Sequence, residues 1–90
     1  LLLDNPRIVE RDVVRIAAMR PTRPEIIELV ATHGRWSSRY PVRLAIALNP
    51  STPVPVARRL LPTLMRTDLK EALAAGSLDP ALREEVRRLL

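Results

Sequence analysis

Apolar residues recur along most of this chain with the spacing of an α-helix. Between positions 9 and 19, for example, Val9, Val13, Ile16 and Ala17 fall on one side of a 3.6-residue period. No stretch alternates polar and apolar residues over the length of a strand, so the pattern predicts an all-α protein. Six helices are expected, over about 9–19, 23–33, 38–48, 53–64, 68–75 and 80–90.

Polar residues ahead of several apolar runs predict helix starts. Thr22 and Glu25 have the spacing of a capping box, and Asp79 precedes Pro80 as an N-cap precedes a first-turn proline. For the third and fifth helices, the expected caps are Ser37 or Ser38 and Thr67 or Asp68. A capping residue accepts hydrogen bonds from amides that have no partner inside the helix.

Proline and glycine predict the helix ends. Arg20-Pro21 should stop the first helix, and Gly34 and Gly76 should close the second and fifth in a left-handed conformation. Pro62 predicts a kink or an early end in the fourth. The inward residues of the second helix should be Ile26, Ile27, Val30 and Ala31, and Glu84 and Arg88 should pair across one turn of the sixth. The third helix is apolar all round from 44 to 48 and should be the most buried.

Helix and turn sequences recur at a nearly constant offset. Val14-Arg15-Ile16-Ala17 lies 28 residues before Val42-Arg43-Leu44-Ala45, and Pro21 and Pro24 lie 29 before Pro50 and Pro53. A further step of 27 residues leads from Pro53 to Pro80. The recurrence predicts a single domain over 1–90, with units at roughly 9–34, 35–64 and 65–90 and with 1–8 as the remnant of a preceding unit. The fold expected is a right-handed α-solenoid of about six short helices in three two-helix repeats, and a compact helical bundle is the alternative.

The stretch at 42–53 reads Val-Arg-Leu-Ala-Ile-Ala-Leu-Asn-Pro-Ser-Thr-Pro. It resembles the bacterial leucine-rich repeat variant family, whose repeats carry Asn-Pro-x-Thr-Pro turns between short helices, and more broadly HEAT and armadillo repeats. Positions 20–24 keep both prolines of that turn, and positions 76–80 keep only the last. The resemblance implies a helical-repeat segment of a larger bacterial protein.

Composition narrows the possible functions. The chain has no cysteine and a single histidine, His33, so it offers no disulfide, no thiolate-bound metal and no histidine pair for a metal, and we expect no metal, no cofactor and no catalysis. His33 itself is expected beside a helix C-terminus. No basic segment precedes a long apolar run, so we expect neither a signal peptide nor a membrane span, and a cytoplasmic location.

Basic residues are the first candidates for binding a partner. The net charge is +5, and Lys70 is the one lysine among 15 basic residues. Arg15, Arg43 and Lys70 occupy equivalent repeat positions, where they could form a ladder along one edge for a phosphate backbone or an acidic peptide. The same residues could instead form a solvated face that keeps the repeats soluble.

Trp36 is the second candidate. It lies in a polar stretch between Arg35 and Arg39, and an aromatic residue flanked by arginines is typical of an interface hot spot or of a base-stacking site. The alternative, which we favour, is that Trp36 closes the apolar seam between the second and third units, with arginine stems packed over it.

Two functions therefore remain open at the level of sequence. The first is a non-enzymatic helical-repeat scaffold for protein–protein interaction, and the second is nucleic-acid binding along the arginine-rich edge. The Leu-rich termini make pairing between two copies of the chain a further option.

Overall fold

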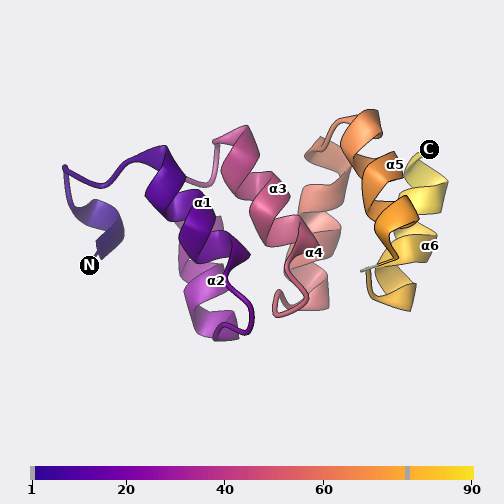
Figure 1. Cartoon of the computed structure of the whole chain (residues 1–90), viewed down its shortest axis with the longest axis horizontal. Helices are drawn as coiled ribbons and strands as arrows, with labels where there is room; N and C mark the ends of the chain where they lie inside the picture. The colour runs from indigo at the N-terminus through magenta and orange to yellow at the C-terminus, as the bar shows by residue number, and fades with distance from the viewer. Residues whose placement is uncertain (1, 77) are drawn as a thin grey trace.

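The computed structural model describes residues 2–76 and 78–90, and all of its regular structure in those ranges is helical (Figure 1). The α-helices are α1 (Glu10–Ala18), α2 (Pro24–Thr32), α3 (Tyr40–Leu48), α4 (Val54–Leu60), α5 (Arg66–Ala75) and α6 (Pro80–Leu89). Two single turns of 3-10 helix, η1 (Leu2–Asp4) and η2 (Leu61–Thr63), complete the order. The prediction of an all-helical chain is confirmed for this part of the sequence.

The helices follow one another along the longest of three axes that measure 38 × 22 × 19 Å. In Figure 1, α1, α3 and α5 lie nearer the viewer, and α2, α4 and α6 lie behind them. α3 packs against α1, α2 and α4, while α6 packs against α4 and α5. This central position explains why α3 has no exposed residue between Val42 and Leu48, as its apolar sequence predicts.

The core consists of two neighbouring clusters that meet at α3 and α4. The first cluster contains Leu3, Ile8, Val13, Ala17, Ile27, Val30, Trp36, Val42, Ile46 and Val56. The second contains Ala47, Ala57, Leu61, Leu64, Leu69, Ala72, Leu78, Leu82 and Val86. Because α3 contributes to both clusters and Leu60 packs against both, the two halves of the molecule share one continuous apolar interior.

Asn49, the residue after α3, ties the ends of α1 and α3 together. Its side-chain amide donates to the carbonyl oxygens of Ala17 and Met19, at 2.8 and 2.9 Å, and its Oδ1 accepts from the amide of Ser51 at 2.9 Å. Asn49 is 3% exposed, so these bonds satisfy carbonyls that the end of α1 leaves without helical partners. The polar residue in the Asn-Pro turn is therefore a structural bridge.

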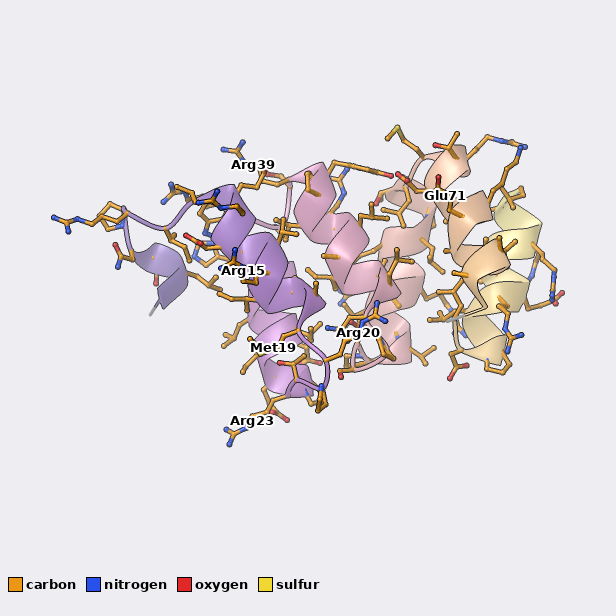
Figure 2. The ribbon with its side chains drawn as sticks, in the orientation of Figure 1. Arg15, Met19, Arg20, Arg23, Arg39 and Glu71 are labelled. Atoms are coloured by element: carbon orange, nitrogen blue, oxygen red, sulfur yellow. The ribbon has the colours of Figure 1, made fainter. Side chains whose placement is uncertain are left out.

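Arg20 and Thr52 complete the same junction. The Arg20 guanidinium donates to the carbonyl of Leu48 at the C-terminus of α3, and Figure 2 shows this side chain extending from the end of α1 toward α3 and α4. Thr52 is buried, and its hydroxyl donates to the carbonyl of Ile46 at 2.6 Å. A cation and a hydroxyl thus donate hydrogen bonds to carbonyl oxygens at the end of α3. Both interactions are favourable because the C-terminus of a helix carries partial negative charge.

Three of the helix starts differ from expectation. Their N-caps are Arg23 for α2, Arg39 for α3 and Met65 for α5, and none of these residues makes a side-chain capping bond. α2 and α3 have a proline in the first two positions, where its fixed φ suits the helix and its missing N–H costs nothing. The expected start of α6 is confirmed, since Asp79 accepts from the amide of Ala81 at 2.9 Å.

The side chains expected as caps have other roles. The amide of Thr22 donates to the hydroxyl of Ser51 at 3.2 Å, so Thr22 does not form a capping box with Glu25. Asp68 accepts a hydrogen bond from the hydroxyl of Tyr40, which links the starts of α5 and α3. Both hydrogen bonds join residues that are 28 or 29 positions apart, a kind of contact that local sequence does not indicate.

Most helix ends follow the sequence. Gly76 closes α5 at φ 69°, in the left-handed region, and the α-helical part of the fourth helix ends at Leu60, just before Pro62 enters the turn η2. Gly34 does not have positive φ, and α2 ends earlier, at Thr32. On α6 the pairs are Arg87 with Glu84 and Arg88 with Glu85, three residues apart instead of four.

Within residues 2–76 and 78–90, no helix has both the length and the apolar character needed to cross a bilayer.

Candidate interaction surfaces

The three residues of the expected basic ladder differ in their surroundings. Arg15 on α1 and Lys70 on α5 are exposed. Arg43 on α3 is half-buried: its guanidinium donates to the carbonyl of Ser38 and lies 5.5 Å from the ring centroid of Tyr40. Arg43 therefore has intramolecular partners, and only the two ends of the ladder present free cationic surface.

Trp36 is in the core and not on the surface. The ring is 2% exposed, and its Nε1–H donates to the carbonyl of Leu3 at 3.0 Å. The Arg35 guanidinium covers the ring at 4.5 Å from its centroid, as expected for an arginine stem packed over an apolar seam. The seam lies between η1 and the first two helix pairs, however, and not between the second and third units. Arg39 is exposed, and its guanidinium nitrogen Nη1 lies 3.9 Å from the carboxylate oxygen Oε1 of Glu10.

His33 joins the first turn of the chain to the end of α2. Its Nε2 is 2.8 Å from Oδ1 of Asp4, and its Nδ1 accepts from the amide of Arg35 at 3.3 Å. In a neutral imidazole one nitrogen accepts and the other donates, so this geometry makes Nε2–H the donor to Asp4. The hydrogen bond from His33 lowers the pKa of the Asp4 carboxyl below its ordinary value of 3.8.

An exposed apolar patch on α1 and α2 was not predicted from the sequence. Met19, Ile26 and Leu29, here called the α1–α2 patch, are 53%, 37% and 47% exposed. They line a hollow of about 320 Å³ together with Leu3, Ile16, Thr22 and Val30. Thr22 supplies the one polar side chain in that lining, so the hollow offers mainly a place for apolar groups.

The sequence contained a signal for this patch. Ile26 was assigned to the buried face of α2, but Ile27 and Val30 take that face and leave Ile26 and Leu29 on another side. A helix with apolar residues on two sides needs a second covering surface. That second side is the one exposed in the structure.

Basic side chains lie along α1 toward the patch. Arg11, Arg15 and Met19 are all exposed and follow one another at four-residue spacing, which places them on one face of the helix. Figure 2 shows Arg15 and Arg23 on either side of Met19. A second hollow, of about 360 Å³, is lined by Asn5, Arg7, Ile8, Asp12, Arg15 and Ile16, and it shares Ile16 with the first. The patch therefore continues into a basic track formed by Arg7, Arg11 and Arg15.

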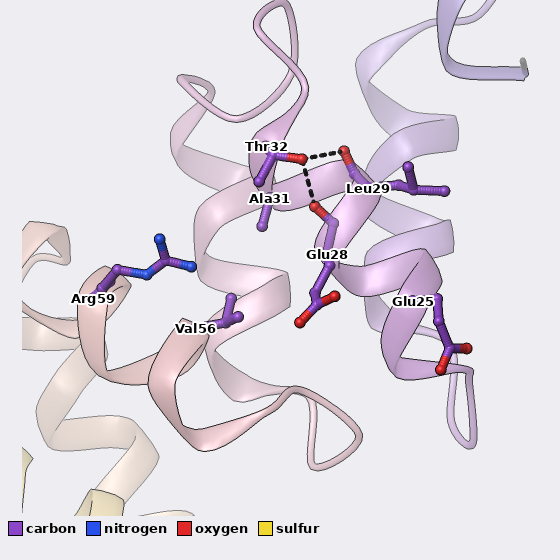
Figure 3. A pocket seen from close by; sticks show the side chains of 7 residues that line it. All are labelled: Glu25, Glu28, Leu29, Ala31, Thr32, Val56 and Arg59. Carbon is purple, nitrogen blue, oxygen red and sulfur yellow. Dashed lines mark hydrogen bonds between the residues drawn. The ribbon is translucent and has the colours of Figure 1, made fainter.

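A larger groove separates α2 from α4 on the other side of α2 (Figure 3). Its volume is about 540 Å³, and Glu25 and Glu28 on α2 face it together with Arg59 on α4 and Val56 at its floor. The hydroxyl of Thr32 donates to the carbonyl of Glu28 at 2.8 Å, which keeps it directed at its own helix. This groove has walls of opposite charge. Leu29 of the α1–α2 patch also lines it, so the patch has arginines on its α1 side and the carboxylates of Glu25 and Glu28 on its α2 side.

The described residues contain no group of three or more histidine, cysteine, aspartate or glutamate side chains that could hold a metal ion. The closest polar pairs, His33 with Asp4 and Tyr40 with Asp68, connect one part of the fold to another. Comparison of the chain with protein-family models, with curated proteins and with solved structures gives no match.

Proposed function

We propose that the chain is a non-enzymatic helical-repeat scaffold, a segment of a right-handed α-solenoid of the leucine-rich repeat variant or HEAT type, that binds a protein partner. Support for the repeat comes from contacts of nearly constant sequence separation. Asp4 bonds to His33 and Thr22 to Ser51 across 29 residues in each case, and Tyr40 bonds to Asp68 across 28. Contacts between equivalent positions of neighbouring units have this property.

The Asn-Pro-Ser-Thr-Pro turn gives further support. Asn49 bonds to the carbonyls of Ala17 and Met19, which belong to the corresponding end of the preceding unit. In a stacked array, each such turn would form hydrogen bonds to the turn of the preceding unit, so the same motif would be needed in every unit. Arg20, at the position equivalent to Asn49, makes the reciprocal bond to Leu48.

The observation that carries the proposal of protein binding is the α1–α2 patch. Among the side chains that the structure describes, five large apolar ones are well exposed, and four of them, Val9, Met19, Ile26 and Leu29, lie on or beside α1 and α2. Scattered exposed apolar residues are ordinary, but a group around an apolar hollow is typical of an interaction surface. A protein partner would remove these side chains from water, whereas a phosphate backbone would not.

The competing function is binding of nucleic acid along Arg15, Arg43 and Lys70. It has less support, because the Arg43 guanidinium is engaged with Ser38 and Tyr40 inside the chain. The Trp36 ring, the one tryptophan available for base stacking, is buried.

A peptide-display selection tests the proposal. Random peptides selected on the wild-type chain are re-tested on Ile26→Asp/Leu29→Asp and on Met65→Asp. Met65 is an equally exposed apolar residue outside the patch, at 57%. We expect selected peptides to bind the wild type and Met65→Asp and to lose binding to the double variant, with circular dichroism unchanged.

The opposite result is equally clear. Selected peptides that bind Ile26→Asp/Leu29→Asp as tightly as the wild type would contradict the proposal. So would a duplex or single strand that binds tightly, weakens steeply with added salt and is lost in an Arg15, Arg43, Lys70 neutral variant, because that pattern belongs to phosphate recognition.

A further inference from the structure

We infer that the partner of the α1–α2 patch is an acidic amphipathic helix, an inference that rests on the proposed function and specifies its ligand. Apolar side chains on one face of the partner would enter the hollow beside Met19, Ile26 and Leu29. Carboxylates on its flank would lie against the basic track of Arg7, Arg11 and Arg15.

The shape of the surface fits a helix laid into a groove. The two hollows share Ile16 and together follow α1 from Arg7 to Met19. Their volumes, about 320 and 360 Å³, suit a few aliphatic anchors, and anchors spaced at i, i+3, i+4 and i+7 are how an amphipathic helix occupies an apolar groove. The backbone around the patch is helical, with no sheet edge in the described ranges to add a strand to, so an extended peptide has no ladder to extend.

The charges around the patch favour an acidic ligand. Arg7, Arg11, Arg15 and Arg23 are exposed, and among residues 2–76 and 78–90 none of them forms an ion pair. Asp12 is the single carboxylate that lines either hollow, and its Oδ2 accepts from the amide of Val9. Glu25 and Glu28, which are exposed on α2 next to Ile26 and Leu29, line the α2–α4 groove instead, so the cations lie on the α1 side of the patch. Arginine binds carboxylates in a bidentate manner, and the net charge of +5 would also draw an acidic ligand toward the chain.

A second copy of the chain fits this surface less well. Two copies meeting patch to patch would bring their basic tracks together, and like charges across an interface oppose association. A head-to-tail arrangement would set the patch against the outer end of the molecule, where α6 exposes Glu84, Arg87 and Arg88. The first arrangement opposes like charges, and the second would take the ion pairs of α6 out of water, which carries a desolvation cost.

Three synthetic helical peptides test the inference by fluorescence anisotropy with the full chain. The first has a leucine stripe flanked by glutamates, the second has the same stripe flanked by lysines, and the third has glutamates with serines in place of the leucines. We expect the first to bind at least tenfold more tightly than either of the others and to gain helical circular dichroism when bound.

Variants of the chain locate the binding. Arg11→Gln/Arg15→Gln should weaken the first peptide about fivefold to tenfold, while Arg87→Gln/Arg88→Gln, which removes the same charge on α6, should leave it unchanged. Ile26→Asp/Leu29→Asp should abolish binding, and Met65→Asp should not.

The possible failures separate the two proposals. Equal binding of the first and second peptides, still dependent on Ile26 and Leu29, would overturn the acidic preference and leave the scaffold proposal standing. Display-selected ligands that need the patch but are extended would overturn the helical partner alone. Self-association that is lost in Ile26→Asp/Leu29→Asp would show that a second copy is the occupant, and binding of the serine peptide or a DNA duplex at equal strength would show a purely electrostatic site.

Discussion

The indole of Trp36 donates a hydrogen bond to the backbone carbonyl of Leu3, 33 positions earlier in the chain, at 3.0 Å. Both side chains belong to the first core cluster, so the bond holds η1 against the interior. Because Trp36 is the only tryptophan, its fluorescence reports whether η1 is docked. This pair makes the first turn of the structure directly observable.

Acid should release η1. The hydrogen bond from His33 lowers the pKa of Asp4 below its ordinary value of 3.8, so the carboxylate form stabilises the docked state. That stabilisation is complete above the ordinary pKa and is lost as the pH falls through the lowered, folded-state pKa. We expect a red shift of Trp36 emission in a titration from neutral pH into this acid range.

The control for this titration is Asp4→Asn. It keeps the shape of the side chain and removes its titration, so the acid-dependent step should disappear while the rest of the curve remains. An identical step in Asp4→Asn would show that other titratable groups cause the change.

Replacing Asn49 should cost more stability than replacing any other polar residue of the turns. Asn49→Ala removes three hydrogen bonds and leaves the carbonyls of Ala17 and Met19 without that donor, for an expected loss of about 2–4 kcal/mol. Ser51→Ala removes one half-buried acceptor and should cost about 0.5–1.5 kcal/mol. Urea unfolding followed by circular dichroism measures both values, and equal losses would contradict the bridging role of Asn49.

The two glycines should respond oppositely to alanine. Gly76 has φ 69°, a conformation in which a side chain is strained, so Gly76→Ala should destabilise the chain by about 1 kcal/mol. Gly34 has no positive φ, and a Cβ there would meet nothing within 4 Å, so Gly34→Ala should be neutral or stabilising by up to about 1 kcal/mol. Thermal melting of the two variants side by side tests the assignment.

Tyr40 should titrate above its ordinary pKa of 10.0. Partial burial and the hydrogen bond to Asp68 raise the pKa, since both disfavour the phenolate. The resulting stabilisation is present below the ordinary value and is lost as the pH rises through the raised, folded-state pKa. Tyr40 is the only tyrosine, so ultraviolet absorbance gives its titration directly, and a midpoint at or below 10.0 would contradict the contact.

Two variants compared with each other separate the two bonds that the Tyr40 hydroxyl makes. Tyr40→Phe removes the donor to Asp68 and the acceptor for the amide of Met65, which is 2.9 Å from the hydroxyl. We expect a loss of about 1–2 kcal/mol in urea unfolding. Asp68→Asn should lose less, because an amide oxygen can still accept from the hydroxyl.

The sequence predicted the helices well because their periodicity, prolines and one glycine act locally. The early end of the fourth helix before Pro62, the αL end at Gly76 and the cap at Asp79 all depend on residues within one turn. The third helix was correctly expected to be the most buried, since an apolar surface on every side requires covering on every side.

Contacts between distant residues could not be predicted in the same way. The backbone amide of Thr22 donates to Ser51, where a capping box would have it donate to Glu25, and the Asp68 carboxylate accepts from Tyr40. Trp36 is expected to close an apolar seam between the second and third units, but the seam that buries it contains Leu3 and the first core cluster, which its neighbours in sequence do not indicate. The α1–α2 patch depends on which of two apolar sides of α2 faces the core, a choice made by tertiary packing.

The contact between α1 and α3 is firmer than the contact between α2 and α4. α3 packs directly on α1, and Asn49 and Arg20 bond their ends together, whereas α2 and α4 are separated by the groove at Glu28 and Arg59. A load that spreads α2 from α4 would meet less resistance than one that spreads α1 from α3, because the second would have to break the hydrogen bonds of the buried Asn49 side chain. The first four helices should therefore bend more easily by opening or closing the α2–α4 side than by parting α1 from α3.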